Sequence, residues 1–187
     1  MRCPYCDQPL AADAAECPSC RLTYPRTSAL LGAMPRLTPI VSDTTGSLLP
    51  AEASKLRRRI EEIQRNLPQL VLQVVIHHFP AEHPFSMHVF WLFNAGAFAG
   101  DGRRGKDSHV MLLVLDPARC ESALMPGYGL EPLLKREALD HLLELAGPYW
   151  DNRQWADGIH RVLTGLEQLL HSVSVPDDSA VLPKGEY

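Results

Sequence analysis

Two Cys-x-x-Cys pairs near the amino terminus constrain this chain more than any other feature of its sequence. The residues are Cys3 and Cys6, then Cys17 and Cys20, with ten residues between the pairs. A two-residue gap lets a tight turn aim both sulfurs of a pair at one ion, and ten residues are enough for a short hairpin that brings the second pair across. Zinc prefers four thiolates in a tetrahedron. The spacing therefore predicts structural zinc in a small ribbon over residues 1–24, with two redox dithiols or a pair of disulfides as the alternative.

A metal ion would supply the folding free energy of this ribbon, because so short a segment has no core of its own. Metal binding contributes on the order of 10 to 16 kcal/mol in comparable peptides. Four thiolates leave no open coordination position, which argues against a catalytic zinc. The fifth cysteine, Cys120, stands apart on an expected strand, and we interpret it as a buried thiol without a role.

The charge and the apolar pattern argue against several classes of protein. The 187 residues include 18 Lys and Arg against 22 Asp and Glu, a net charge of -4, whereas a dedicated nucleic-acid binder usually carries a basic surplus. No apolar run approaches the roughly 18 residues needed to cross a bilayer, and no apolar segment follows a basic one at the amino terminus. We therefore expect a cytoplasmic protein with no membrane span and no nucleic-acid partner, in a compartment where thiols stay reduced.

Composition divides the rest of the chain into a linker, a folded domain and a tail. Residues 25–39 are rich in proline with scattered Ser, Thr and Gly, which is typical of a linker without a long helix. Apolar periodicity is strong from about residue 48 to residue 172, and we expect the folded domain over residues 40–172. Residues 173–187 have the composition of a flexible tail.

The apolar pattern of residues 40–172 predicts an α/β domain. Apolar residues that recur every three or four positions indicate helices, and near-continuous apolar runs indicate buried strands. The expected helices cover residues 50–67, 84–94, 130–146 and 154–172, and the expected strands cover residues 70–79, 110–115 and 118–125, with a further edge strand possible at 39–41. The last strand is expected to run antiparallel to the one before it. This order of elements is typical of a layered α/β arrangement.

Several short motifs follow one another through the same domain. They are Ser42-Asp43 before a Leu-Leu-Pro helix start, Leu92-Phe93-Asn94, Gly105-Lys106-Asp107 before a strand, Gly127-Tyr128-Gly129-Leu130-Glu131 at a helix start, and the aromatic-rich stretch from Trp150 to Ile159. Over roughly residues 40–172 this order resembles the TPM domain, a family named for its thylakoid-lumen, phosphatase-like and membrane-associated members. The Gly-Tyr-Gly-Leu-Glu match is the most specific element of the resemblance.

The resemblance implies a three-layer α/β sandwich with a mixed, Rossmann-like sheet between helices. Some members of the family are described as phosphatases, some bind a divalent metal near acidic loop residues, and others are assembly or chaperone-like factors. Most members also carry a signal peptide or a membrane helix, whereas this sequence shows neither pattern and has the cysteine ribbon instead.

The acidic residues at the matched positions are Asp43, Asp107 and Glu131, and loop carboxylates at strand ends are suitable ligands for Ca²⁺ or Mg²⁺. Two departures from the family bear on such a site. The usual Asp-Asn-Gly stands here as Asp107-Ser108-His109, and an Asp that usually follows the Gly-Tyr-Gly-Leu-Glu motif is replaced within Leu134-Lys135. A divalent site of two or three of these carboxylates is one interpretation. The other is a set of solvated loop acids, since Glu131 also favours a helix N-terminus.

Together these patterns predict a zinc ribbon linked to a TPM-like domain that serves as an interaction or assembly module for a protein partner. The alternative is a divalent-metal-dependent phosphatase that uses Asp43, Asp107 and Glu131, in which the metal would polarise the phosphoryl oxygens and activate water. The sequence shows no obvious nucleophile or positioned base for that reaction.

Overall fold

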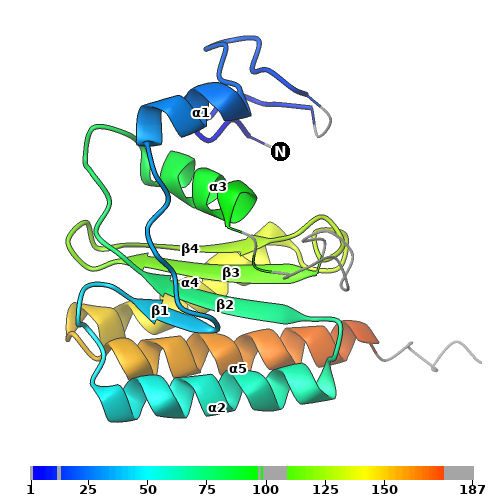
Figure 1. Ribbon diagram of the computed structural model, residues 1–187. Coiled ribbons are helices and arrows are strands. Elements are labelled where there is room, and N and C mark those ends of the chain that lie inside the picture. Colours follow the sequence, from blue (N-terminus) through cyan, green and yellow to red (C-terminus); the bar gives the residue numbers. More distant parts are fainter. Residues whose placement is uncertain (1, 12–13, 97, 99–108, 175–187) are drawn as a thin grey trace, which may run out of the picture.

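The computed structural model describes residues 2–11, 14–96, 98 and 109–174, and in this part of the chain it has five helices and four strands (Figure 1). In chain order the elements are α1 (Tyr24–Leu31), β1 (Val41–Asp43), α2 (Pro50–Asn66), β2 (Val71–Ile76), α3 (Phe85–Ala95), β3 (Val110–Asp116), β4 (Glu121–Pro126), α4 (Arg136–Asp151) and α5 (Trp155–Ser174).

The four strands form one mixed sheet in the order β1-β2-β3-β4. β1 and β3 pair with β2 in parallel. β4 pairs with β3 antiparallel, as expected from the sequence. β4 begins at Glu121 rather than at residue 118, because the residues before it form a tight turn. The Asp116 carboxylate accepts hydrogen bonds from the backbone N–H groups of Ala118 and Arg119 at 3.0 and 3.4 Å, which fixes this turn.

Cys120 lies in the same turn and not on the strand. Its φ is 53° and its side chain is exposed. The expectation of a buried strand thiol is therefore wrong, because the carboxylate that shapes the turn moves the start of the strand beyond this cysteine.

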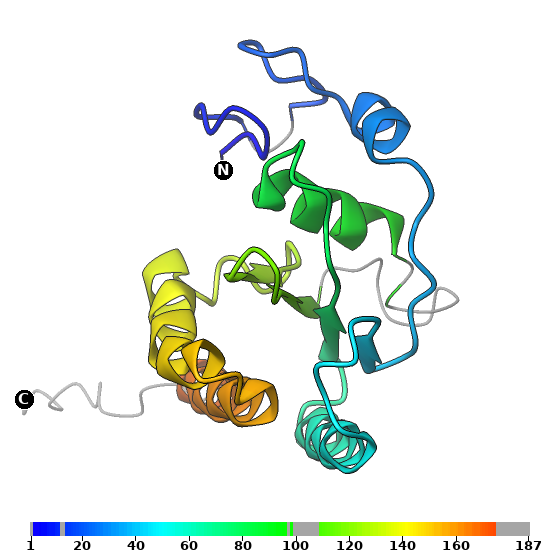
Figure 2. The same cartoon turned by 90° about the vertical axis from the view of Figure 1, so that its left-hand side faces the viewer.

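Helices cover both faces of the sheet and complete the three-layer sandwich expected from the sequence. α2, α4 and α5 lie on one face and α3 lies on the other (Figures 1 and 2). Side chains of β3 alternate between the two faces. Met111 and Leu113 join the core under α2 and α5, while Leu112 and Val114 join the core under α3. Every residue of β3 is buried, which explains its continuous apolar sequence.

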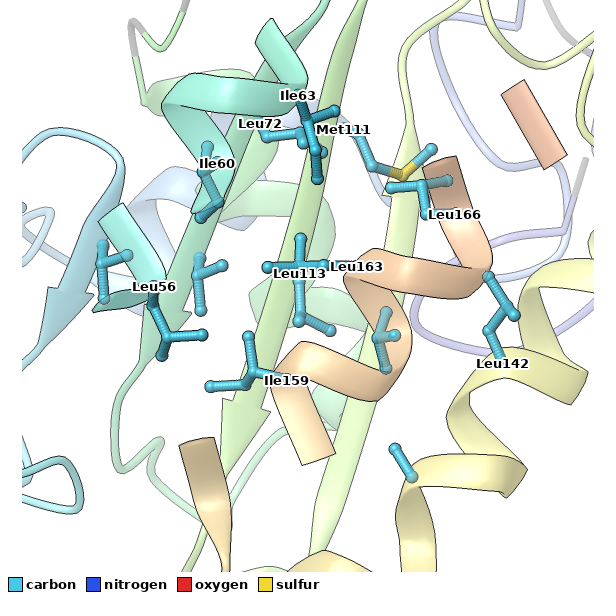
Figure 3. Packing of buried hydrophobic residues seen from close by; sticks show 14 of the residues in the cluster. Leu56, Ile60, Ile63, Leu72, Met111, Leu113, Leu142, Ile159, Leu163 and Leu166 are labelled. Atoms are coloured by element: carbon cyan, nitrogen blue, oxygen red, sulfur yellow. The ribbon is translucent and has the colours of Figure 1, made fainter. Parts of the chain in front are cut away.

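The core under α2 and α5 is aliphatic and closely packed. Leu56, Ile60 and Ile63 lie on the inner face of α2, at the spacing that predicted this helix, and they face side chains of β2 and β3 across the interface (Figure 3). Pro50 occupies the first turn of α2, where its missing N–H costs nothing. The Glu52 side chain accepts the backbone N–H of Leu49 at 2.8 Å and so closes the start of the helix.

α4 and α5 pack against each other at two glycines of α5. A Cβ atom at Gly158 would clash with the indole of Trp150, and one at Gly165 would clash with the end of the Leu142 side chain. α4 begins at Arg136, six residues after the expected start at 130, because residues 127–134 form successive turns that begin with Leu130 N–H donating to Gly127 O at 2.8 Å.

The expected linker of residues 25–39 contains most of α1, a helix that the proline content did not predict. Thr23 caps it by accepting the backbone N–H of Arg26 at 3.3 Å, and Pro25 lies in its first turn. Beyond α1 the chain enters β1 through a tight turn in which Ile40 has a φ of 68°. The buried Gln73 side chain holds this turn, because its Oε1 accepts the Ile40 N–H at 2.8 Å and its Nε2 donates to Thr38 O at 3.0 Å.

Candidate metal centre

The two Cys-x-x-Cys pairs fold into two turns of the same design. In the first, Cys3 N–H donates to Gln8 O at 2.9 Å and Asp7 N–H donates to Cys3 O at 3.0 Å. In the second, residues 17–22 repeat both bonds at 3.0 and 2.8 Å. The residue after the second cysteine has a φ of 56° in each turn. The paired turns therefore aim their sulfurs from two sides at one point, as the spacing predicted.

The four Sγ atoms are spaced as ligands of one ion would be. All four lie within 4.8 Å of one another, with Cys3 and Cys20 separated by 3.6 Å and Cys6 and Cys17 by 3.7 Å. A tetrahedron with metal–sulfur bonds of about 2.3 Å has sulfur–sulfur edges of about 3.8 Å. The cysteine cluster, by which we mean Cys3, Cys6, Cys17 and Cys20, is thus positioned to hold a metal ion.

The local environment of the cluster favours an ionised sulfur at one position and opposes it at another. The backbone N–H groups of Cys20 and Ser19 point at Cys17 and lower the pKa of its thiol to about 6. Burial raises the pKa of the Cys20 thiol to about 12. A bound cation would remove this conflict, since metal-bound thiols are deprotonated outright, and metal binding would release protons.

The cysteine cluster is packed against the α/β domain. Its inner side chains share a small apolar cluster with Leu22 and with Met87 of α3, which is 0% exposed. The Ser86 hydroxyl donates to Pro4 O, inside the first Cys-x-x-Cys pair, at 2.6 Å. Beside this contact the ring of Tyr24 in α1 meets Phe90 of α3 edge-on, with centroids 6.5 Å apart. The ribbon and α1 therefore form a further layer over α3 (Figure 1).

Asp43 stands at the carboxyl end of β1, as expected, but its carboxylate already has a full set of donors. Oδ1 accepts the backbone N–H groups of Thr45 and Gly46 at 2.8 and 3.0 Å and the Thr45 hydroxyl at 2.8 Å. Oδ2 accepts the Leu48 N–H at 2.7 Å. These four bonds fold the turn that leads into α2, so the side chain performs a structural task.

Asp43 and Glu131 lie at opposite ends of the sheet. Asp43 pairs with Ile76, which pairs with Leu115 near the end of β3, whereas the turn with Glu131 follows Gly127, which bonds Val110 at the start of β3. At about 3.3 Å per residue, the two ends are roughly 16 Å apart. The structure therefore does not bring these two carboxylates together. Asp107 lies outside the described residues, and a site that combines it with the exposed Glu131 stays a prediction.

Sequence reasoning did not find the most deeply buried carboxylate among the described residues, Asp116, at the carboxyl end of β3. It is 1% exposed, accepts the Phe79 N–H at 2.9 Å, and lies 3.3 Å from Nδ1 of His78. The only sequence signal was an Asp-Pro pair directly after a strand. This pair indicates a turn, but it does not indicate that the carboxylate also bonds the loop at Phe79.

The family model described as the TPM domain matches residues 41–169. The chain belongs to the TPM domain family. The match begins at β1 and ends within α5, so the cysteine cluster and α1 lie outside it. A comparison with curated proteins gave no match. None of the described helices combines the length and the apolar character that a membrane crossing requires.

Two solved structures share the fold of this TPM protein. One is the N-terminal domain of a protein from P. gingivalis, with a TM-score of 0.56 and 20% identity over 71% of this chain and 82% of that chain. The other is the N-terminal domain of the cg2496 protein from Corynebacterium glutamicum, with a TM-score of 0.54 and 17% identity over 84% of this chain and 97% of that chain. At these identities the likeness establishes the fold alone.

Proposed function

We propose that this protein is an interaction or assembly module in which a structural zinc ribbon, fixed on α3, gives a TPM domain a second binding surface. The observation that carries the proposal is the closed set of four sulfurs packed against a fully buried methionine of the domain. Such a set has no open position for a substrate, so its chemistry is structural.

Zinc is the ion that suits this donor set best. Four thiolates in a tetrahedron are the usual structural zinc site, whereas Ca²⁺ and Mg²⁺ require oxygen ligands. The repeated hydrogen bonds of the two turns support the same conclusion, because they set all four sulfurs on one centre without help from a larger core.

The outer surface of the ribbon and α1 has the composition of a binding surface. Tyr5 and Tyr24 are 46% and 40% exposed, and Leu30 of α1 is 47% exposed. Tyrosine is enriched in the residues that dominate protein interfaces, because it combines a large rigid ring with a polar tip. We propose that the ribbon holds these rings for a protein partner.

The phosphatase alternative has less support. Among the described residues the cysteine cluster is the one group of three or more metal-type side chains gathered at one point, and the Asp43 carboxylate is engaged in the turn before α2. A phosphatase would have to draw its divalent site from Asp107 and Glu131 without Asp43.

The decisive experiment has two arms. The first identifies a partner by crosslinking the full chain, and then titrates the purified partner with wild type and with the Tyr5→Ala variant. We expect affinity to fall about tenfold or more. Tyr149→Ala, which removes a tyrosine of similar exposure from α4, is the control and should bind normally.

The second arm tests the alternative with a generic phosphate ester, in magnesium or calcium and then in chelator. We expect no metal-dependent turnover. Turnover that chelation stops and that Asp107→Ala abolishes would overturn the interaction proposal in favour of the phosphatase.

A further inference from the structure

We propose that metal occupancy of the cysteine cluster controls the β2–α3 loop, residues 77–84, at the carboxyl end of the sheet, and that the first turn of α3 transmits the effect. This inference rests on the proposed metal-bound ribbon and adds a regulatory role to it. The contacts that carry it form an unbroken chain from the sulfurs to the loop.

The β2–α3 loop carries the polar groups of the sheet edge where open α/β folds bind ligands. His77 Nδ1 lies 2.6 Å from the Thr44 hydroxyl, and His78 Nδ1 lies 3.3 Å from the buried Asp116 carboxylate. The chain leaves β1 toward α2 on one face and leaves β2 toward α3 on the other (Figures 1 and 2). The position of this loop therefore determines which polar groups are exposed at the carboxyl edge of the sheet.

α3 holds this loop through two neighbouring groups. The Phe79 ring packs against Phe85 and His88, with ring centroids 5.9 and 4.9 Å apart. His88 Nε2 lies 3.1 Å from Pro80 O, and burial lowers the pKa of His88, so a neutral imidazole donates this bond. With its ring held, Phe79 directs its backbone N–H to Asp116 at 2.9 Å.

The ribbon holds the same turn of α3 from the opposite side. Met87 packs against Cys3 and Cys17, and the Ser86 hydroxyl donates to Pro4 O. The four residues of this helical turn thus contact two different neighbours. Phe85 and His88 touch the loop, while Ser86 and Met87 touch the ribbon. Neither set of contacts can loosen without affecting the other.

This turn has little stability of its own. Pro84 occupies the N-cap position of α3 and makes no side-chain cap, and the first turn contains no acidic residue. Its order therefore depends on the contacts on both sides. Loss of the metal would unfold the two cysteine turns, uncover Met87 and let this end of α3 fray.

A second set of hydrogen bonds confines the loss of order to the β2–α3 loop. The Arg119 guanidinium, from the β3–β4 turn, donates to Pro80 O at 3.2 Å and to His83 O at 3.0 Å. Pro80 O is thus shared between Arg119 and His88. When α3 frays, this carbonyl keeps one donor, so the loop is released on one side while the strands stay paired.

Hydrogen exchange of single amides in the full-length chain tests the inference. The amide of Phe79, bonded to Asp116, should exchange at least about tenfold faster after zinc is removed with a chelator. The control is the amide of Val74, which bonds Ile40 O at 2.8 Å between β1 and β2 and whose side chain lies in the core under α2 and α5, away from α3. Its rate should change less than about twofold.

Three outcomes contradict the inference, and they are distinguishable. A chain that binds zinc but shows the same Phe79 exchange with and without it refutes this inference and leaves the proposed function standing. Equal acceleration at Phe79 and Val74 means global destabilisation, which also refutes the relay. A chain that binds no metal refutes both proposals.

A pair of methionine variants tests the relay with zinc in place. Met87→Ala removes the contact between ribbon and helix, whereas Met125→Ala removes a similar side chain that packs on the α3 core from β4. Phe79 exchange should accelerate severalfold in Met87→Ala, with one zinc still bound, and should change less in Met125→Ala. Equal rates in the two variants would contradict transmission through Met87. Should Met87→Ala fail to fold, Ser86→Ala offers the same test at an exposed position.

Discussion

The ribbon and the α/β domain of this protein are stabilised by opposite means. The domain buries aliphatic and aromatic side chains on both faces of its sheet. The ribbon buries two cysteines and Leu22, and takes its largest apolar contact, Met87, from the neighbouring domain. Stability in the domain is therefore spread over many contacts, whereas under the proposed metal site the stability of the ribbon would depend on one ion. One change at the ribbon should therefore have a larger local effect than any single change in the core.

The largest effect should follow from Cys17→Ser. Loss of one thiolate removes most of the metal binding free energy, which is on the order of 10 kcal/mol, so residues 2–23 should unfold. The domain should stay folded, because its two cores contain none of these cysteines. Backbone amide NMR of the full chain would show the loss of the ribbon signals.

Cys120→Ser is the matched control for this prediction. It removes an exposed thiol outside the cysteine cluster and should leave the spectrum and the metal content unchanged. If Cys17→Ser also unfolded the domain, the two regions would not be separate in stability.

A smaller effect is expected from Leu163→Ala in the core. This leucine of α5 is 1% exposed and packs in the core under α2 and α5 (Figure 3). Its truncation should lower the free energy of unfolding by about 2–5 kcal/mol in urea denaturation. Zinc affinity should stay unchanged, since α3 and the sheet separate this core from the ribbon. A large loss of zinc affinity would show that the ribbon and the domain form one cooperative unit.

Gly158 in α5 and Gly147 in α4 offer a still smaller test, because only one of them is closely packed. Gly158→Ala places a Cβ against the rigid indole of Trp150 and should destabilise the domain by about 1–3 kcal/mol, despite a better helix propensity. Gly147→Ala, in α4, meets nothing within 4 Å beyond its chain neighbours, but the Pro148 ring crowds a Cβ on the preceding helical residue and offsets the better helix propensity, so stability should change by less than about 0.5 kcal/mol. Thermal unfolding of the pair would measure both, and a stabilised Gly158→Ala would contradict the close packing of α4 and α5.

The smallest effect should come from acidification. Burial lowers the pKa values of His77, His88 and His160 below their usual 6.5, so the folded chain binds fewer protons than the unfolded chain between the two values. The stability that the three neutral histidines contribute is fully present above pH 6.5 and is lost as the pH falls below it. Urea denaturation from about pH 7.5 to about 5.5 should show it. His160→Gln should make the free energy of unfolding depend less on pH. A stronger dependence in this variant would contradict the lowered pKa of His160.

Local chemistry explains which features the sequence could predict. The cysteine cluster depends on two short turns, and the two buried strands depend on runs of apolar residues, so both are visible in neighbouring residues. The antiparallel pairing of the last two strands was also predicted, and the Asp-Pro pair between them is a local turn signal. These features needed no knowledge of distant contacts.

The features that sequence reasoning missed depend on distant partners or on backbone groups. The contact between Pro4 and Ser86, which packs the ribbon on α3, joins segments far apart in the chain. The matched position of Asp43 suggested a metal ligand, yet backbone N–H groups of the next turn occupy its oxygens. The helix α1 depends on a threonine cap and on packing against α3. The proline-rich composition of this segment indicates neither of them.

Elemental analysis of the purified full-length protein, dialysed with and without calcium, tests the central claim most directly. The account predicts one zinc ion per chain in wild type, none in Cys17→Ser, and no calcium retained in either. A wild-type chain without zinc, or one that keeps its zinc after the loss of Cys17, would contradict it.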